Sequence, residues 1–162
     1  MIPDFEMHYK KLRELYLRAT TKQRILVAID RMRYPDAGPN LLITAVSAVE
    51  ALARAMALEV ERRSGRPLRA AYRRLRNLGP VELLEKVVAR AHGVRVSDLI
   101  GPGTWEEFQW AVKYRNLLLH EGTYLAQLYS RPLLRSTHAL FDKLVRLSEI
   151  RDKPTLDQEP RS

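Results

Sequence analysis

No cysteine occurs in the 162-residue chain. This absence excludes disulfide bonds, thiolate nucleophiles and the usual cysteine-rich zinc sites, and it favours an intracellular location. The first residues, Met1 to Glu6, lack the basic start and the apolar run of a signal peptide. No stretch approaches the roughly 20 apolar residues that a membrane span needs. We therefore expect a cytoplasmic protein that has no membrane as a partner.

Glycine-rich phosphate loops and metal-ligand spacings are also missing. No such loop precedes a basic helix start, and His8, His92 and His138 do not have the spacing of metal ligands. We therefore expect neither a cofactor nor a bound metal ion.

The amino-acid composition indicates one basic domain. Hydrophobic residues make up 46% of the chain, which is enough for one domain with a core and too little for two of ordinary size. We expect this domain to span residues 1–152, followed by a disordered tail over residues 153–162. The formal net charge of +9 favours a polyanionic partner through counterion release, although many basic proteins bind no nucleic acid specifically.

Apolar residues recur three and four positions apart almost throughout, and nowhere do they alternate for long with a period of two. This pattern predicts an all-α fold. The first helical pattern runs from Phe5 to Arg33, with a break allowed near Thr20-Thr21. The next helix is predicted to take Asn40 as its N-cap and to run to about Arg63.

The second half of the chain contains four further boundaries. Gly79-Pro80 separates two shorter helices, and Gly93 ends the second of them. A capping box over residues 104–107 predicts that another long helix begins at Trp105, and Pro132 is predicted to open the last helix. We expect an up-and-down bundle of four long helices with a short helical hairpin inserted in it.

The most informative segment is the hexapeptide from Arg115 to His120, near the end of the helix predicted from Trp105. A permanently charged guanidinium and an imidazole that titrates near neutrality supply the phosphate neutralisation and proton transfer that RNA cleavage needs. At about 100° per residue, Asn116 and His120 lie side by side, and Arg115 lies roughly 140° around the helix from His120.

That rotation places Arg115 among core-facing residues, where an unpaired charge would cost several kcal/mol. Arg115 should therefore meet a carboxylate, or open onto a groove formed with another helix or another subunit. Glu50, in the apolar run of the second helix, is the internal carboxylate that we expect to pair with it. The alternative for Glu50 is an ordinary pair with Arg54.

Arg-x4-His with an asparagine directly after the arginine, late on a helix of a small all-helical bundle, resembles the HEPN superfamily. The resemblance is specific over residues 115–120 and elsewhere concerns length, helix order and the apolar second helix that carries Glu50. It implies a metal-independent endoribonuclease, commonly a toxin or defence effector with an antitoxin partner, whose site forms where two such helices meet across a homodimer. By the same resemblance His120 acts as general base or acid, Arg115 stabilises the phosphorane, and Asn116 holds the phosphate or the imidazole. The product would carry a 2′,3′-cyclic phosphate.

Two other interpretations remain open. Some members of the superfamily have lost catalysis, so the chain is alternatively a non-catalytic HEPN-like module that binds a nucleotide or a protein partner. In a purely structural bundle, His120 would be a helix-end residue favoured by the dipole, Arg115 a buried ion pair, and Asn116 an exposed polar residue.

A second basic segment offers an RNA-binding surface, because its arginines follow helical spacing opposite Leu68, Tyr72 and Leu75. Arginine suits phosphate because its planar fork donates two hydrogen bonds at once. The solvated face of an amphipathic helix is the alternative explanation. The arginines concerned are Arg66, Arg69, Arg73 and Arg76.

The helix predicted from Trp105 also carries a second apolar stripe, formed by Trp110, Tyr114 and Leu117. A helix that is apolar on most of its circumference is buried on several sides, either at the centre of a bundle or in a dimer interface. We therefore expect a homodimer.

Overall fold

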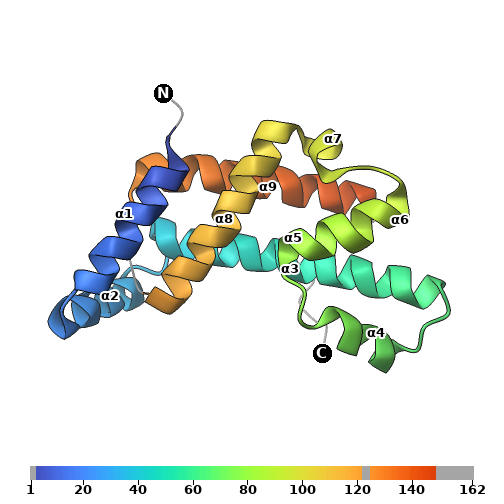
Figure 1. Ribbon diagram of the computed structural model, residues 1–162, viewed down its shortest axis with the longest axis horizontal. Helices are drawn as coiled ribbons and strands as arrows, with labels where there is room; N and C mark the ends of the chain where they lie inside the picture. Colours follow the sequence, from blue (N-terminus) through green and yellow to red (C-terminus); the bar gives the residue numbers. More distant parts are fainter. Residues whose placement is uncertain (1–2, 122–124, 149–162) are drawn as a thin grey trace, which may run out of the picture.

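Three long helices form the centre of the computed structural model, which describes residues 3–121 and 125–148. These are α3 (Gly38–Arg63), α8 (Pro102–Glu121) and α9 (Gln127–Leu147), and each of them contacts the other two (Figure 1). Within the described residues every regular element is a helix. The predicted all-α class is confirmed.

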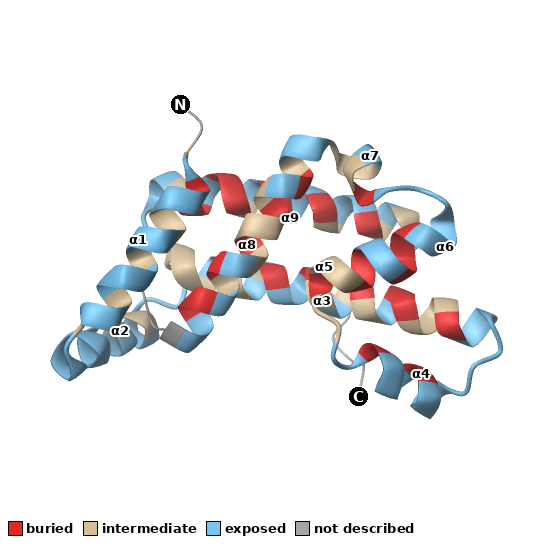
Figure 2. Cartoon of the chain, in the orientation of Figure 1, coloured by how far each residue is buried: buried red, intermediate tan, exposed pale blue. Residues whose placement is uncertain are grey.

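The core follows from the helical spacing of apolar side chains. Figure 2 shows buried positions on the facing sides of α3, α8 and α9, with exposed positions on their outer sides. Each aliphatic side chain removed from water in this way contributes about 1.5–3 kcal/mol before conformational entropy is subtracted. The fully buried positions include Leu42, Val46, Val49, Ala53, Phe108, Ala111, Leu118, Leu133 and Leu140.

Helix α3 corrects one expectation. By length and composition it is apolar enough to cross a membrane, although we expected no such stretch. The central helix of a water-soluble bundle passes the same test. In this fold α3 contacts both α8 and α9, and 33% of its apolar window is buried.

The N-terminal pattern divides at the break that the sequence allowed. Helix α1 covers Phe5–Arg18 and α2 covers Thr21–Arg33. Thr20 Oγ1 accepts a hydrogen bond from the Gln23 amide at 3.2 Å, and Gln23 Oε1 accepts one from the Thr20 amide at 2.8 Å. This reciprocal capping box satisfies two amides that would otherwise lack partners, and it begins α2 as a separate helix.

Asn40 has a different role from the one predicted. Helix α3 begins at Gly38, with Ala37 as its N-cap, so Asn40 already lies within the first turn. Its side-chain amide donates to the carbonyl of Arg31 at 2.9 Å and to that of Tyr34 at 3.0 Å. Asn40 was wrongly predicted as an N-cap, because it satisfies carbonyls at the end of α2 instead of amides at the start of α3.

Two shorter helices connect α3 to α8, as predicted. The first is α4 (Leu68–Leu75), and the second is a continuous helical stretch divided into α5 (Pro80–Glu82), the π-helical η1 (Leu83–Ala89) and α6 (Arg90–His92). Gly93 ends this stretch in the left-handed conformation, with φ of 66°, which glycine adopts without steric cost. A short helix, α7 (Val96–Ile100), follows.

The starts of the last two long helices were predicted too late. Helix α8 begins at Pro102 instead of Trp105, because proline suits the first helical turn, where its missing amide costs nothing. Helix α9 begins at Gln127, so Pro132 is a buried residue inside the helix and does not open it. The last helix was expected to run to about Ile150, and this end and the predicted tail over residues 153–162 both lie outside the described residues.

Candidate functional site

The hexapeptide occupies the last turns of α8, and its polar side chains face two directions. The Arg115 side chain is 14% exposed and lies towards α3, whereas Asn116 and His120 are exposed. Within the described residues no hydrogen bond joins Arg115 to His120. The helix therefore separates the two groups within one chain, as the rotation calculated from the sequence predicts.

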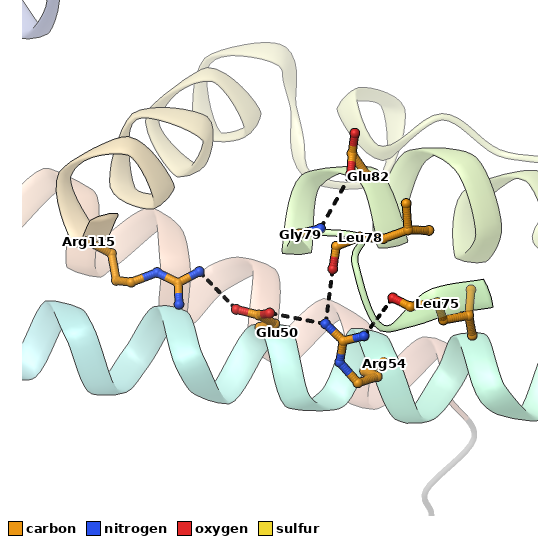
Figure 3. A network of polar contacts seen from close by, with 7 residues as sticks. All are labelled: Glu50, Arg54, Leu75, Leu78, Gly79, Glu82 and Arg115. Carbon is orange, nitrogen blue, oxygen red and sulfur yellow. Dashed lines mark hydrogen bonds and ion pairs between the residues drawn. The ribbon is translucent and has the colours of Figure 1, made fainter. Parts of the chain in front are cut away.

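Glu50 joins two arginines on either side of it (Figure 3). Its Oε2 lies 2.8 Å from Nη2 of Arg115, and its Oε1 lies 3.2 Å from Nη2 of Arg54. The expected Glu50–Arg115 pair is confirmed, and the alternative pair with Arg54 forms at the same time. Because Glu50 and Arg54 are four residues apart, they lie on one face of α3.

Arg54 extends this network to the connection that follows α4. Its Nη1 donates to the carbonyl of Leu75 at 2.7 Å, and its Nη2 donates to that of Leu78 at 3.0 Å. Two arginines share one carboxylate here, so the network retains one positive charge in excess. Nε of Arg115 is buried and has no hydrogen-bond partner in the described part of the chain. Glu50 therefore orients Arg115 and neutralises the network only in part.

Arg31, at the end of α2, is a further cation that the sequence interpretation missed. Its Nη1 donates to the carbonyl of Leu118, in the last turn of α8. The last four carbonyls of a helix have no intrahelical partner, so a cation at this position completes the helix end. The two residues are 87 positions apart, and nothing in the local pattern around Arg31 indicates the contact.

The arginines of the second basic segment do not behave alike. Nε of Arg66 lies 2.5 Å from the buried carboxylate of Glu61, whereas Arg69, Arg73 and Arg76 are exposed and have no ion pair among residues 3–121 and 125–148. Of the apolar residues opposite them, Leu75 is buried, but Leu68 and Tyr72 are 66% and 53% exposed.

The two basic regions lie far apart in one chain. Figure 1 shows α4 towards the opposite end of the long axis from α2 and the C-terminal end of α8. The fold therefore does not bring the α4 arginines to the hexapeptide.

The apolar stripe of α8 is covered by α1 of the same chain. Tyr114 is fully buried, and its ring meets those of Phe5 and Tyr9 at centroid distances of 6.2 and 5.5 Å. Its hydroxyl donates to the carbonyl of Phe5 at 3.0 Å and lies 2.7 Å from Nδ1 of His8. Helix α1 of the same chain therefore covers Tyr114, as expected of a helix buried on several sides.

Burial changes the titration of both polar groups in this contact. It raises the pKa of Tyr114 well above its usual range, so the phenol stays protonated and remains a donor. Burial, and secondarily the charge of Lys11, lower the pKa of His8. Because the only hydrogen of the phenol is donated to Phe5, a neutral His8 has its proton on Nδ1 and donates it to Tyr114.

A different apolar surface remains uncovered, on α2. No residue of this helix is buried. Ile25, Ile29 and Met32 recur along one face and are 54%, 40% and 87% exposed, and Leu26 beside them is 51% exposed. We call these four residues the α2 stripe. The sequence interpretation did not identify it.

Comparison with known proteins adds no relative. No protein-family model, no curated protein and no solved structure matches this chain. Within the described residues, no three His, Asp or Glu side chains gather as they would around a metal ion. The resemblance to the HEPN superfamily thus depends on residues 115–120 and on the helical architecture.

Proposed function

We propose that this protein is a metal-independent endoribonuclease of the HEPN type, a cytoplasmic homodimer that serves as the toxin of a toxin–antitoxin or defence system. The observation that carries the proposal is the arrangement on α8. Glu50 fixes Arg115 in a network with one excess positive charge, and Asn116 and His120 are exposed on the same helix. The substrate is RNA, because the reaction uses the 2′-hydroxyl.

The reaction needs one proton removed and one returned. His120 accepts the proton of the 2′-hydroxyl while the oxygen forms a bond to phosphorus. The bond from phosphorus to the 5′-oxygen then breaks as that oxygen receives a proton from a protonated His120. The products are a 2′,3′-cyclic phosphate and a 5′-hydroxyl. General acid–base catalysis of this kind contributes about 10²–10⁴-fold. Arg115 stabilises the phosphorane charge, and Asn116 donates to a phosphate oxygen.

A second copy of the chain completes the site. Arg115 and His120 face different directions on one α8, so a phosphate reaches both kinds of group where two α8 ends face each other. The α2 stripe supports this arrangement, because it exposes apolar surface on the helix whose Arg31 contacts the last turn of α8. Leu119, next to His120, is 49% exposed and places further apolar surface at the end of α8.

The α4 arginines would serve RNA binding at a distance from cleavage. Arg69, Arg73 and Arg76 are exposed on or next to α4 and suit contacts to successive phosphates, whereas Arg66 is held by Glu61.

One observation favours a second candidate, the non-catalytic HEPN-like module that binds a nucleotide or a protein partner such as an antitoxin. Arg115 is largely covered and paired, as a structural arginine would be. Arg115→Lys separates the two candidates, because lysine keeps the charge opposite Glu50 but loses the planar fork. A nuclease loses about 10²-fold or more of its rate with little change in melting temperature, by analogy with removal of one oxyanion donor. A structural arginine shows a change in melting temperature alone.

The direct test of function uses RNA and a matched oligonucleotide with 2′-deoxyribose at every position, both incubated with pure protein in a chelator. We expect cleavage of the RNA and none of the deoxy oligonucleotide. Tight RNA binding without any cleavage would select the non-catalytic module.

A further inference from the structure

The surface of the protein contains a cleft of about 510 Å³. It is bounded by the end of α2, the turn into α3 and the start of α9. Arg31 lines this cleft and also donates to the Leu118 carbonyl of α8, so the cleft adjoins the helix end that carries His120. Its volume lies within the range of roughly 300–1,000 Å³ that is typical of small-molecule sites.

The walls of the cleft are held in place by hydrogen bonds. The Asn40 amide donates both of its hydrogens, to the carbonyls of Arg31 and Tyr34. The Ala37 amide donates to the Tyr34 carbonyl at 3.0 Å. These contacts fix the turn between α2 and α3, and they leave Asn40 Oδ1 as an acceptor.

The floor of the cleft depends on a close approach of two helices. A Cβ added at Gly38 would lie 3.0 Å from Oγ of Ser130, so glycine lets the start of α3 lie against α9. Ser130 is 2% exposed and lines the cleft. Its hydroxyl can both donate and accept, so it can meet either kind of polar group on a ligand.

The remaining lining suits a nucleobase with hydrogen-bond donors. Tyr34 is 61% exposed and offers a ring for stacking, which is worth about 1–3 kcal/mol for a base. Asp36 has two carboxylate oxygens and no ion pair within the described residues, and Arg131 is an exposed cation in the lining. Guanine presents two adjacent donors, N1–H and the N2 amino group, which a carboxylate accepts together. Uracil presents a single N–H between two carbonyl oxygens, which a carboxylate repels.

We propose that this cleft binds one base of the RNA substrate and selects guanine, with Tyr34 stacking on the ring, Asp36 accepting from its Watson–Crick edge and Arg131 facing the attached phosphate. This inference rests on the proposed nuclease function, because it assigns the base preference of that same site.

Isothermal titration of the intact protein with guanosine, adenosine, cytidine and uridine 5′-monophosphates tests the proposal. We expect guanosine monophosphate to bind at least about fivefold more tightly than uridine monophosphate, since one paired hydrogen bond to a charged group is worth roughly that much or more. Asp36→Asn should abolish this difference in affinity, and Tyr34→Ala should weaken the binding of all four nucleotides. Asp142→Asn, an exposed substitution on α9, is the matched control and should change nothing.

Equal affinities for the four nucleotides would overturn the proposal, and so would a guanosine preference that survives Asp36→Asn in a folded protein. His120→Ala separates this result from the nuclease function, because it should remove cleavage and leave nucleotide binding unchanged. Guanosine binding that depends on Asp36, in a protein that cleaves no RNA, would refute the nuclease function and support the guanine-selective cleft. RNA cleavage without a preference among the four nucleotides would support the nuclease function and refute the guanine-selective cleft.

Discussion

Glu50 and Arg115 are 65 residues apart in the sequence, yet Oε2 of the one lies 2.8 Å from Nη2 of the other. The contact joins the central helix α3 to the last turns of α8. It also sets the direction of the Arg115 side chain, because the carboxylate is held from its other oxygen by Arg54. The proposed site depends on this geometry, in which α3 positions Arg115 and α8 leaves His120 exposed.

Removing the charge of Glu50 should destabilise the protein. Glu50→Gln leaves two partly buried arginines without a counter-charge, and after allowance for their partial exposure we expect a decrease of about 1–3 kcal/mol in the free energy of unfolding. Urea denaturation measures this decrease in the free energy of unfolding. Glu59→Gln, which removes two exposed pairs on the same helix, with Arg62 and Arg63, is the control and should have little effect. Equal effects of the two substitutions would contradict the role assigned to Glu50.

Charging the α2 stripe should separate the proposed dimer. Ile29→Glu combined with Met32→Glu places two carboxylates on a surface that we expect to be buried between copies, where unpaired charge is strongly unfavourable. Analytical ultracentrifugation should show a dimer for the wild type and a monomer for the variant, with RNA cleavage abolished and helical content kept. Leu68→Glu, at an exposed position of α4, should leave the dimer intact. A variant that stays dimeric would place the interface elsewhere.

Acid should weaken the contact between α1 and α8. The pKa of His8 is lowered in the folded protein by burial and by Lys11, so its neutral form is favoured there. As the pH falls below about 6.5, the unfolded chain binds the proton first, and the free energy of unfolding decreases until the folded pKa is passed. We expect a smaller decrease in His8→Gln when urea unfolding is compared at pH 7.5 and pH 5. The same decrease in both proteins would show that His8 contributes nothing to it.

Neutralising two α4 arginines should weaken RNA binding without changing where RNA is cut. Arg69→Gln with Arg73→Gln removes two exposed cations. The slope of log affinity against log salt should fall by about 0.7 for each phosphate of single-stranded RNA that these arginines neutralise in the wild type. Arg90→Gln with Arg95→Gln removes the same charge from another exposed region and is the control. Identical slopes for the two double variants would show that the α4 arginines contribute only through the net charge of the protein and make no phosphate contacts of their own.

Helical periodicity predicts which faces of a helix are apolar, but it does not say which segment covers them. The stripe containing Tyr114 was correctly identified, and the structure shows α1 packed on Tyr114. The exposed apolar face of α2, which includes Ile29 and Met32, was not identified. What covers an apolar face depends on contacts between segments distant in sequence.

The polar contacts of the site were predictable only where burial left few choices. An arginine on a core-facing stripe requires a carboxylate, and Glu50 is the acidic residue within the apolar part of α3, so their pairing followed from the sequence. Asn40 and Arg31 lie at helix ends, where several carbonyls and amides compete for each side chain. Their actual partners depend on how the helices meet, which no local pattern specifies.

The central claim is that His120 transfers the protons of RNA cleavage. Cleavage rates in a chelator should therefore be compared for the wild type, His120→Ala and His138→Ala, the last being an exposed histidine of α9, together with the end groups of the products. We expect the wild type and His138→Ala to give the same rate and 2′,3′-cyclic phosphate ends, and His120→Ala to be slower by about 10²-fold or more while remaining folded. Undiminished cleavage by His120→Ala, or a wild type that leaves RNA intact, would contradict the account.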